Sequence, residues 1–151
     1  MSFFNSKLRY ALCAAVDLAM QPPAESCQSR EIAARQAIPG PYLDQILAAL
    51  KGAGIVRSVR GAGGGYSLAR TPERISVGDV VRALMRGDRL FSSCAEDENP
   101  DLAAPGVNWV VRTFEEQVED SLGSLLDATT LKDLVRRKHA IDDTMSMMPE
   151  I

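Results

Sequence analysis

A glycine-rich connection between two short β-forming runs constrains the fold of this chain more than any other feature. Residues 61–65 contain four glycines, with Arg60 before them and Tyr66 after them. The run 55–60 alternates partly and is rich in β-branched residues, and the run 66–69 shows the same pattern. Two such runs around glycines are typical of a β-hairpin. We therefore predict a hairpin with a long, mobile tip.

Three helical segments precede this hairpin. Apolar residues recur every three or four positions from Ser6 to Met20 and again from Pro41 to Lys51, which is the spacing of one buried helix face. Between them, Ser29 can cap a short helix that ends near Gln36. Residues 38–40 then form a turn, and Pro41 takes the first helical position, where its missing N–H is tolerated. Helix, short helix, turn, helix and hairpin is the order of a winged helix-turn-helix, with 41–51 as recognition helix.

The segment after the hairpin predicts one short helix and then a loop. Ser76, or Thr71 further out, precedes apolar residues at helical spacing that continue to Leu84. Residues 87–106 lose this periodicity and collect Ser, Asp, Glu, Pro and Gly. We therefore expect a loop or linker over 87–106.

The longest periodic segment, residues 107–126, predicts a helix that joins two copies of the chain. Its apolar steps of three and four resemble a coiled-coil seam about two heptads long. One small domain cannot cover such a stripe, so a partner helix should complete it. The stripe consists of Val111, Phe114, Val118, Leu122 and Leu125.

A short final helix is expected over the sequence LKDLVRRK, residues 131–138, capped by Thr129 or Thr130, with a frayed tail over 144–151. The predicted fold is thus mainly α-helical with a small β-hairpin wing. We divide the chain into a winged domain over 1–86, a linker over 87–106 and a dimerisation part over 107–151.

Charge is distributed unevenly along the chain. Residues 1–90 carry twelve basic and seven acidic side chains, a net charge of +5, whereas residues 91–151 carry five and thirteen, a net charge of −8. A basic half is typical of a domain that meets a polyanion. Arg60 in a flexible tip suits the narrow minor groove of double-stranded DNA. The alternative is a winged module whose main partner is another protein.

Several other classes of protein are disfavoured. The apolar runs fall far short of the ~20 residues that span a bilayer. Asp17 interrupts the first apolar stretch and no cleavage site follows, so we expect neither a signal peptide nor a membrane partner. Cys13, Cys27 and Cys94 lie far apart with no CxxC pair, which fits a reducing cytoplasm rather than a disulfide framework.

No catalytic constellation is present in the sequence. There is one histidine, no GxSxG elbow and no paired metal-ligand spacing. Gly61 and Gly63 match the start of a GxGxxG phosphate loop, but Tyr66 occupies the position of its third glycine. The acidic run 96–98 lacks the spacing of a calcium loop. We therefore expect a protein that is not an enzyme.

The winged part of the chain carries specific sequence motifs. Residues 6–86 contain the stretch SKLRYAL…REIAARQAIPGPYLDQILAALKGAGIVRSVRGAGGGYSLAR…ISVGDVVRAL. This stretch closely resembles the Rrf2 family of bacterial winged-helix regulators. A weaker match is added by TLKDLV near Thr130. That family includes iron–sulfur, nitric-oxide and cysteine-metabolism repressors. The resemblance implies a homodimer, joined through its long C-terminal helix, that represses transcription from a palindromic operator.

The resemblance also assigns roles to residues. Asp44 falls where similar proteins place an acidic residue that reads a base, and a carboxylate can accept a hydrogen bond from a cytosine amino group. Arg60 falls where the wing arginine enters the minor groove. Tyr42 looks like a DNA contact, with an inward-facing tyrosine as the alternative. The full set of candidate DNA contacts is Lys7, Arg9, Arg30, Pro41, Tyr42, Asp44, Gln45, Arg57, Arg60, Gly61 and Gly64. Of these, Lys7, Arg9, Arg30 and Arg57 are candidate phosphate contacts.

The sensing part is where the sequence departs from the family. Cluster-bearing relatives have three cysteines in the loop before the long helix, whereas this loop has Cys94 alone. Because a cluster held by cysteine needs about four ligands, we expect no iron–sulfur cluster and no other metal. Cys94 is either a thiol sensor or a cysteine without function, and His139 is expected as a solvated cation at a helix end. Whether a protein or a small molecule acts as effector stays open.

Overall fold

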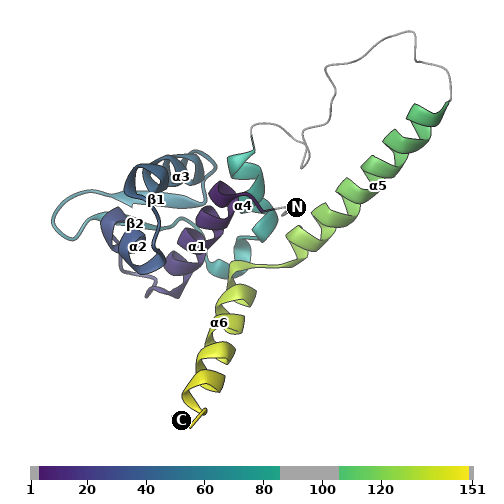
Figure 1. Ribbon diagram of the computed structural model, residues 1–151. Coiled ribbons are helices and arrows are strands. Elements are labelled where there is room, and N and C mark those ends of the chain that lie inside the picture. Colours follow the sequence, from purple (N-terminus) through teal and green to yellow (C-terminus); the bar gives the residue numbers. More distant parts are fainter. Residues whose placement is uncertain (1–3, 86–105, 150–151) are drawn as a thin grey trace.

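The computed structural model describes residues 4–85 and 106–149, and Figure 1 shows a compact N-terminal body from which two helices project. The described part is mainly helical, with one two-stranded antiparallel hairpin, which confirms the predicted fold class. The elements are α1 (Ser6–Met20), α2 (Ser29–Gln36), α3 (Gly40–Gly52), β1 (Val56–Val59), β2 (Gly65–Leu68), the 3-10 helix η1 (Pro72–Arg74), α4 (Val77–Leu84), α5 (Val107–Ala128) and α6 (Leu131–Ser146).

The core of the body lies between the first three helices. On α3, the four leucine and isoleucine side chains predicted to face inward are completely buried: Leu43, Ile46, Leu47 and Leu50. Helix α1 presents Ala11, Ala14 and Ala15, which are also fully buried and whose small side chains let the neighbouring helices approach closely. The periodicity in the sequence therefore identified the buried face of α3 correctly.

Helices α2 and α3 each begin one residue earlier than predicted. Helix α2 is capped by Gln28 and not by Ser29, because the Gln28 N–H donates to Glu31 Oε2 at 2.8 Å. Pro41 is the second residue of α3, after Gly40. Both shifts are of one residue, and neither changes which side of the helix faces the core.

The last helix is longer than expected. Helix α6 continues to Ser146, so His139 lies within it and the first three residues of the expected frayed tail are helical. The Thr144 hydroxyl donates to the Ala140 carbonyl at 2.9 Å, and Lys138 pairs with Asp142 one turn further on. These local bonds extend a helix whose weak apolar periodicity gave no sign of its length.

Helix α5 leaves the body at its carboxyl end (Figure 1). Leu126 is 6% exposed and packs with Leu8, Val77 and Val81, and Leu122 is partly buried against the same cluster. The remainder of α5 projects into solvent in the single chain. In the described residues, no helix is long and apolar enough to cross a membrane.

Candidate nucleic-acid interface

An ion pair between a buried carboxylate and an exposed arginine holds the helix before the turn. Asp17 on α1 is 3% exposed, and its carboxylate accepts hydrogen bonds from Arg35 Nη2 at 2.7 Å, Arg35 Nε at 3.0 Å and Gln36 Nε2 at 2.7 Å. The hydrogen bond to Asp17 raises the pKa of the Arg35 guanidinium above its ordinary value. Because Arg35 and Gln36 end α2, this cluster sets the direction in which the chain enters the turn.

In the sequence, Asp17 stands out only as an interruption of an apolar stretch. An acidic residue on the apolar face of a helix signals a buried partner, since an unpaired buried carboxylate is strongly unfavourable. That signal identifies the acidic half of the pair. It does not identify Arg35, which lies 18 residues away.

The amino-terminal turn of α3 presents a polar, exposed face. Pro41, Asp44 and Gln45 are exposed, whereas Leu43 between them points into the core. This alternation follows from the helix, because residues one and two positions apart face different directions. The structure thus brings three of the sequence-predicted residues to one exposed surface.

Tyr42 combines the two interpretations that the sequence left open. Its ring packs edge-to-face against Tyr10 of α1, with centroids 5.7 Å apart and planes at 83°. The residue is nevertheless 38% exposed. Packing on Tyr10 holds the ring in one orientation while leaving part of the side chain accessible, as is common for tyrosines at binding surfaces.

The wing is tied to the segment between α1 and α2. The Cys27 N–H donates to the Tyr66 carbonyl at 2.9 Å, and the Tyr66 N–H donates to the Cys27 carbonyl at 2.7 Å. Gly65 has a φ of +155°, and a Cβ there would overlap the Cys27 carbonyl. Glycine is therefore required at this crossing for both reasons. The Ser26 hydroxyl adds a bond of 2.6 Å to the Gly63 carbonyl.

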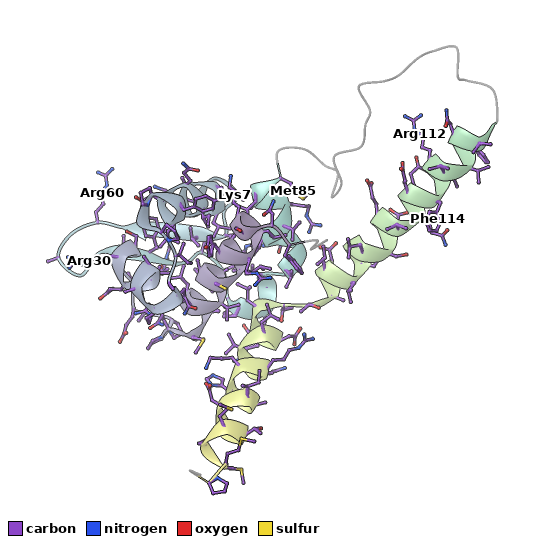
Figure 2. The ribbon with its side chains drawn as sticks, viewed as in Figure 1. Lys7, Arg30, Arg60, Met85, Arg112 and Phe114 are labelled. Carbon is purple, nitrogen blue, oxygen red and sulfur yellow. The ribbon has the colours of Figure 1, made fainter. Side chains whose placement is uncertain are left out.

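The tip of the wing presents an arginine and a closely folded backbone. Arg60 is exposed and projects away from the hairpin (Figure 2). Gly61 adopts a φ of +105°, and the Gly64 N–H donates to the Gly61 carbonyl at 2.9 Å. A Cβ on Gly64 would overlap the Val59 carbonyl, so this tip accepts no side chain at that position.

The remaining basic candidates lie on three different elements. Arg9 on α1 is exposed. Arg30 on α2 is exposed and Lys7 on α1 is half-buried, and both are labelled in Figure 2. Arg57 on β1 is exposed, but its Nε donates to the Ser67 hydroxyl on the facing strand at 3.0 Å. The guanidinium of Arg57 is thus held along the hairpin, whereas Arg60 extends from it.

The apolar stripe of α5 is exposed in the single chain, apart from one member. Val111, Phe114, Val118 and Leu125 are all exposed, and Phe114 is 62% exposed. Leu122, expected on the same stripe, is instead partly buried against α4 in its own chain. The expected stripe also omits the first turn of α5, whose side chains extend the exposed apolar surface: Val107, Trp109 and Val110.

The described cysteines do not form a metal site. Cys27 is buried, and its thiol accepts a hydrogen bond from Arg35 Nη2 at 3.5 Å, so a cation already faces the sulfur. Cys13 is half-buried within α1. Among residues 4–85 and 106–149, no three His, Cys, Asp or Glu side chains are grouped as a metal site requires. Cys94 lies outside the described residues.

Together, a helix, a turn, a second helix with an exposed polar face and an anchored hairpin define a winged helix-turn-helix, the fold of DNA-binding transcription regulators. A family model described as Rrf2, iron-dependent transcriptional regulator, matches residues 4–137. The chain belongs to this family. It is therefore a transcription regulator and not an enzyme.

Individual relatives agree with this assignment. The transcriptional regulator CymR of Bacillus subtilis is 34% identical over 130 residues, covering 86% of this chain and 87% of its own. The solved structure of B. subtilis CymR, described as the global cysteine regulator, matches with a TM-score of 0.71 at 32% identity, covering 91% of this chain and 98% of its own. T. potens IscR matches with a TM-score of 0.69 at 34% identity over 98% of this chain and 93% of its own.

Proposed function

We propose that this chain is a homodimeric repressor that acts in the bacterial cytoplasm and binds a palindromic operator through α3 and the wing. The proposal rests on two exposed features of the same N-terminal body. One is the polar amino-terminal turn of α3 with Asp44, and the other is the anchored wing, whose tip carries Arg60. The net charge of +5 over residues 1–90 favours DNA over a protein as the main partner.

Within this proposal, α3 enters the major groove and the wing enters the adjacent minor groove. Asp44 accepts a hydrogen bond from a cytosine amino group, and Gln45 lies beside it on the same exposed turn. Gly61 and Gly64 let the wing backbone approach the DNA, with Arg60 reaching furthest. Phosphate contacts fall to Lys7, Arg9, Arg30 and Arg57, which position the domain without reading sequence.

The test of base reading is the substitution Asp44→Ala. Because the Asp44 side chain is exposed and makes no hydrogen bond or ion pair with any other described residue, its loss should leave folding unchanged. We expect discrimination at one base pair in each half-site to weaken by about 1–3 kcal/mol, while binding to random DNA stays the same. Competition gel shifts against operators mutated one base pair at a time measure this.

A matched control is Asp143→Ala, which removes another exposed carboxylate, on α6 and not on α3. It should bind as the wild type does. An Asp44→Ala protein that keeps full discrimination at every operator position contradicts the role of Asp44. A wild-type protein that shows no DNA binding, yet captures a protein partner, contradicts the proposal as a whole.

We further propose that this member works without an iron–sulfur cluster. Cys94 stands alone in the loop where cluster-bearing relatives have three cysteines, and the described cysteines do not assemble a ligand set. Anaerobically purified protein should be colourless and bind DNA, and reconstitution with iron and sulfide should not change its affinity. Brown protein with stoichiometric iron in its visible spectrum overturns this expectation.

Cys94 is not proposed as an oxidant sensor either. Glu96, Asp97 and Glu98 follow it, and negative charge beside a thiol disfavours the reactive thiolate. Cys94→Ser should therefore respond to mild peroxide as the wild type does. A variant that has lost an oxidant response present in the wild type contradicts this.

A further inference from the structure

Helices α4, α5 and α6 meet at a junction that fixes how α5 leaves the body. The Val77 N–H donates to the Thr129 carbonyl at 2.8 Å, and the Leu131 N–H donates to the Ile75 carbonyl at 2.9 Å. These two bonds form a short antiparallel bridge between segments more than 50 residues apart. The end of α5 and the start of α4 are thus joined through the backbone.

Both helices that begin at this bridge carry a complete capping box. Ser76 Oγ accepts the Asp79 N–H at 3.0 Å, and Asp79 Oδ2 accepts the Ser76 N–H at 3.0 Å. Thr130 and Asp133 make the same reciprocal pair at 3.1 and 2.9 Å. The backbone hydrogen bond from Thr130 lowers the pKa of Asp133. Reciprocal caps hold both helix starts in one geometry.

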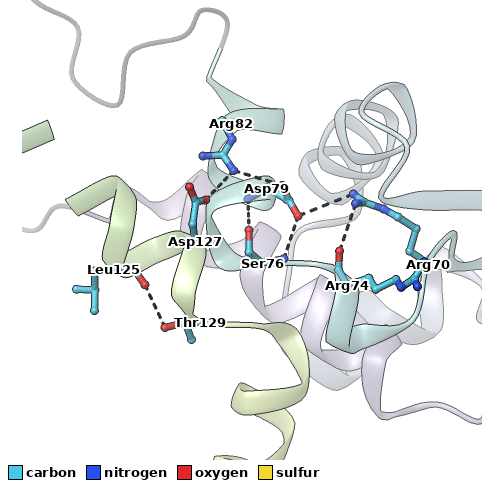
Figure 3. Close-up of polar contacts among 8 residues, drawn as sticks. All are labelled: Arg70, Arg74, Ser76, Asp79, Arg82, Leu125, Asp127 and Thr129. Carbon is cyan, nitrogen blue, oxygen red and sulfur yellow. Dashed lines mark hydrogen bonds and ion pairs between the residues drawn. The ribbon is translucent and has the colours of Figure 1, made fainter. Parts of the chain in front are cut away.

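A row of charges continues from this bridge to the last turn of α5 (Figure 3). Arg82 Nη2 donates to Asp127 Oδ1 at 2.7 Å and to Asp79 Oδ1 at 3.3 Å. On the other side, Arg70 Nη2 lies 3.9 Å from Asp79 Oδ2, just after the wing strand β2. The hydrogen bond to Asp127 raises the pKa of Arg82. The row therefore connects the end of the wing, α4 and α5.

Gly78 explains how α5 approaches α4 so closely. It is buried on α4, and a Cβ at this position would overlap the carboxylate of Asp127. Its φ is not in the left-handed region, so the backbone itself does not require glycine. The absence of a side chain instead makes room for Asp127 to reach Arg82.

We propose that the contact between the Asp127 carboxylate and Gly78, held by Arg82, fixes the direction in which α5 leaves the body. In a dimer, this direction sets the preferred spacing between the two half-sites of an operator. This inference rests on the proposed dimeric function. The pair itself is about half exposed, with side chains 46% and 51% accessible, so its contribution to overall stability is small. The ion pair instead affects the angle between α5 and the body, because it lies where α5 meets the body.

The length of α5 amplifies any change at this end. A helix of 22 residues is about 33 Å long. Rotating it by about 5° at the junction moves its far end by about 3 Å, close to the rise of about 3.4 Å between base pairs. A loosened junction thus lets the two winged domains of a dimer shift by about the rise of one base pair, which lowers the cost of binding operators whose half-sites are displaced by one base pair.

The test uses two variants that break the contact in different ways. Gly78→Ala displaces Asp127 without changing any charge, and alanine is the better helix former at this position. Arg82→Met removes the guanidinium. Arg82→Lys is its conservative counterpart, which keeps the positive charge and should therefore keep part of the wild-type preference for the best operator spacing. Lys138→Met is the matched control, since it removes another exposed ion pair, with Asp142, within α6.

The readout is fluorescence anisotropy with operators whose half-sites are moved by one and two base pairs, and with a single half-site. For Gly78→Ala and Arg82→Met, we expect the affinity ratio between the best and the displaced operators to fall about fivefold. Binding to the single half-site, the dimeric mass in light scattering and the behaviour of Lys138→Met should match the wild type.

Two outcomes are decisive. Variants that keep the wild-type ratio overturn the inference and leave the proposed function intact. A wild-type chain that is monomeric, or indifferent to half-site spacing, overturns the proposed function and this inference with it. Thermal melting of each variant shows whether folding is preserved. Because Arg82→Met affects no buried side chain, this variant still tests the inference if Gly78→Ala unfolds the body.

Discussion

Replacing Phe114 and Val118 together with glutamate should convert the proposed dimer into monomers and remove tight operator binding. Both side chains are exposed in the single chain, at 62% and 38%, so the change does not disturb the core of the body. In a dimer, however, it would bury four carboxylates without partners, which is strongly unfavourable. The two winged domains are then no longer tethered, so each binds its half-site independently. Affinity for the full operator should fall by about 10²- to 10⁴-fold.

Light scattering gives the mass of this double variant, and anisotropy with a full operator gives its affinity. Met145→Glu is a suitable control, because Met145 is a similarly exposed apolar residue that lies on α6 instead of α5. Its mass and affinity should equal those of the wild type. A double variant that is still dimeric excludes this face of α5 as the interface.

Operator binding should also be strongly dependent on salt. If each protomer neutralises about four phosphates, the slope of log K against log salt is near −7 for a dimer, at roughly −0.9 per phosphate. Between 50 and 200 mM salt, affinity then falls by about 10⁴-fold. Arg60→Ala removes one such contact from each protomer, so the slope should become shallower by about 2.

Arg136→Ala is the matched control for Arg60→Ala. It removes an exposed arginine from α6, where Asp133 lies nearby, and it should not alter the slope. Anisotropy titrations at five or more salt concentrations give both slopes. A wild-type slope near zero contradicts phosphate binding by the basic half, and an unchanged slope in Arg60→Ala contradicts the wing contact.

The local elements of this protein followed from the sequence because their signals are local. Apolar spacing located α1 and the buried face of α3, and caps such as Ser76 and Thr130 were found within one turn of the helix they begin. Glycines with positive φ marked the hairpin tip. The resemblance to a family then added roles for Asp44 and Arg60 that spacing alone does not assign.

The contacts that position these elements were decided only by the tertiary structure. Asp17 is bound by Arg35, Cys27 is bridged to Tyr66, and Asp127 lies against Gly78, pairs separated by 18 to 49 residues. Leu122 belongs by spacing to the stripe of α5, yet it packs against α4.

Periodicity reports which residues share a face of one helix, but it does not report which neighbour covers that face. The neighbour depends on how all the elements pack at once, since a close-packed interior admits few arrangements.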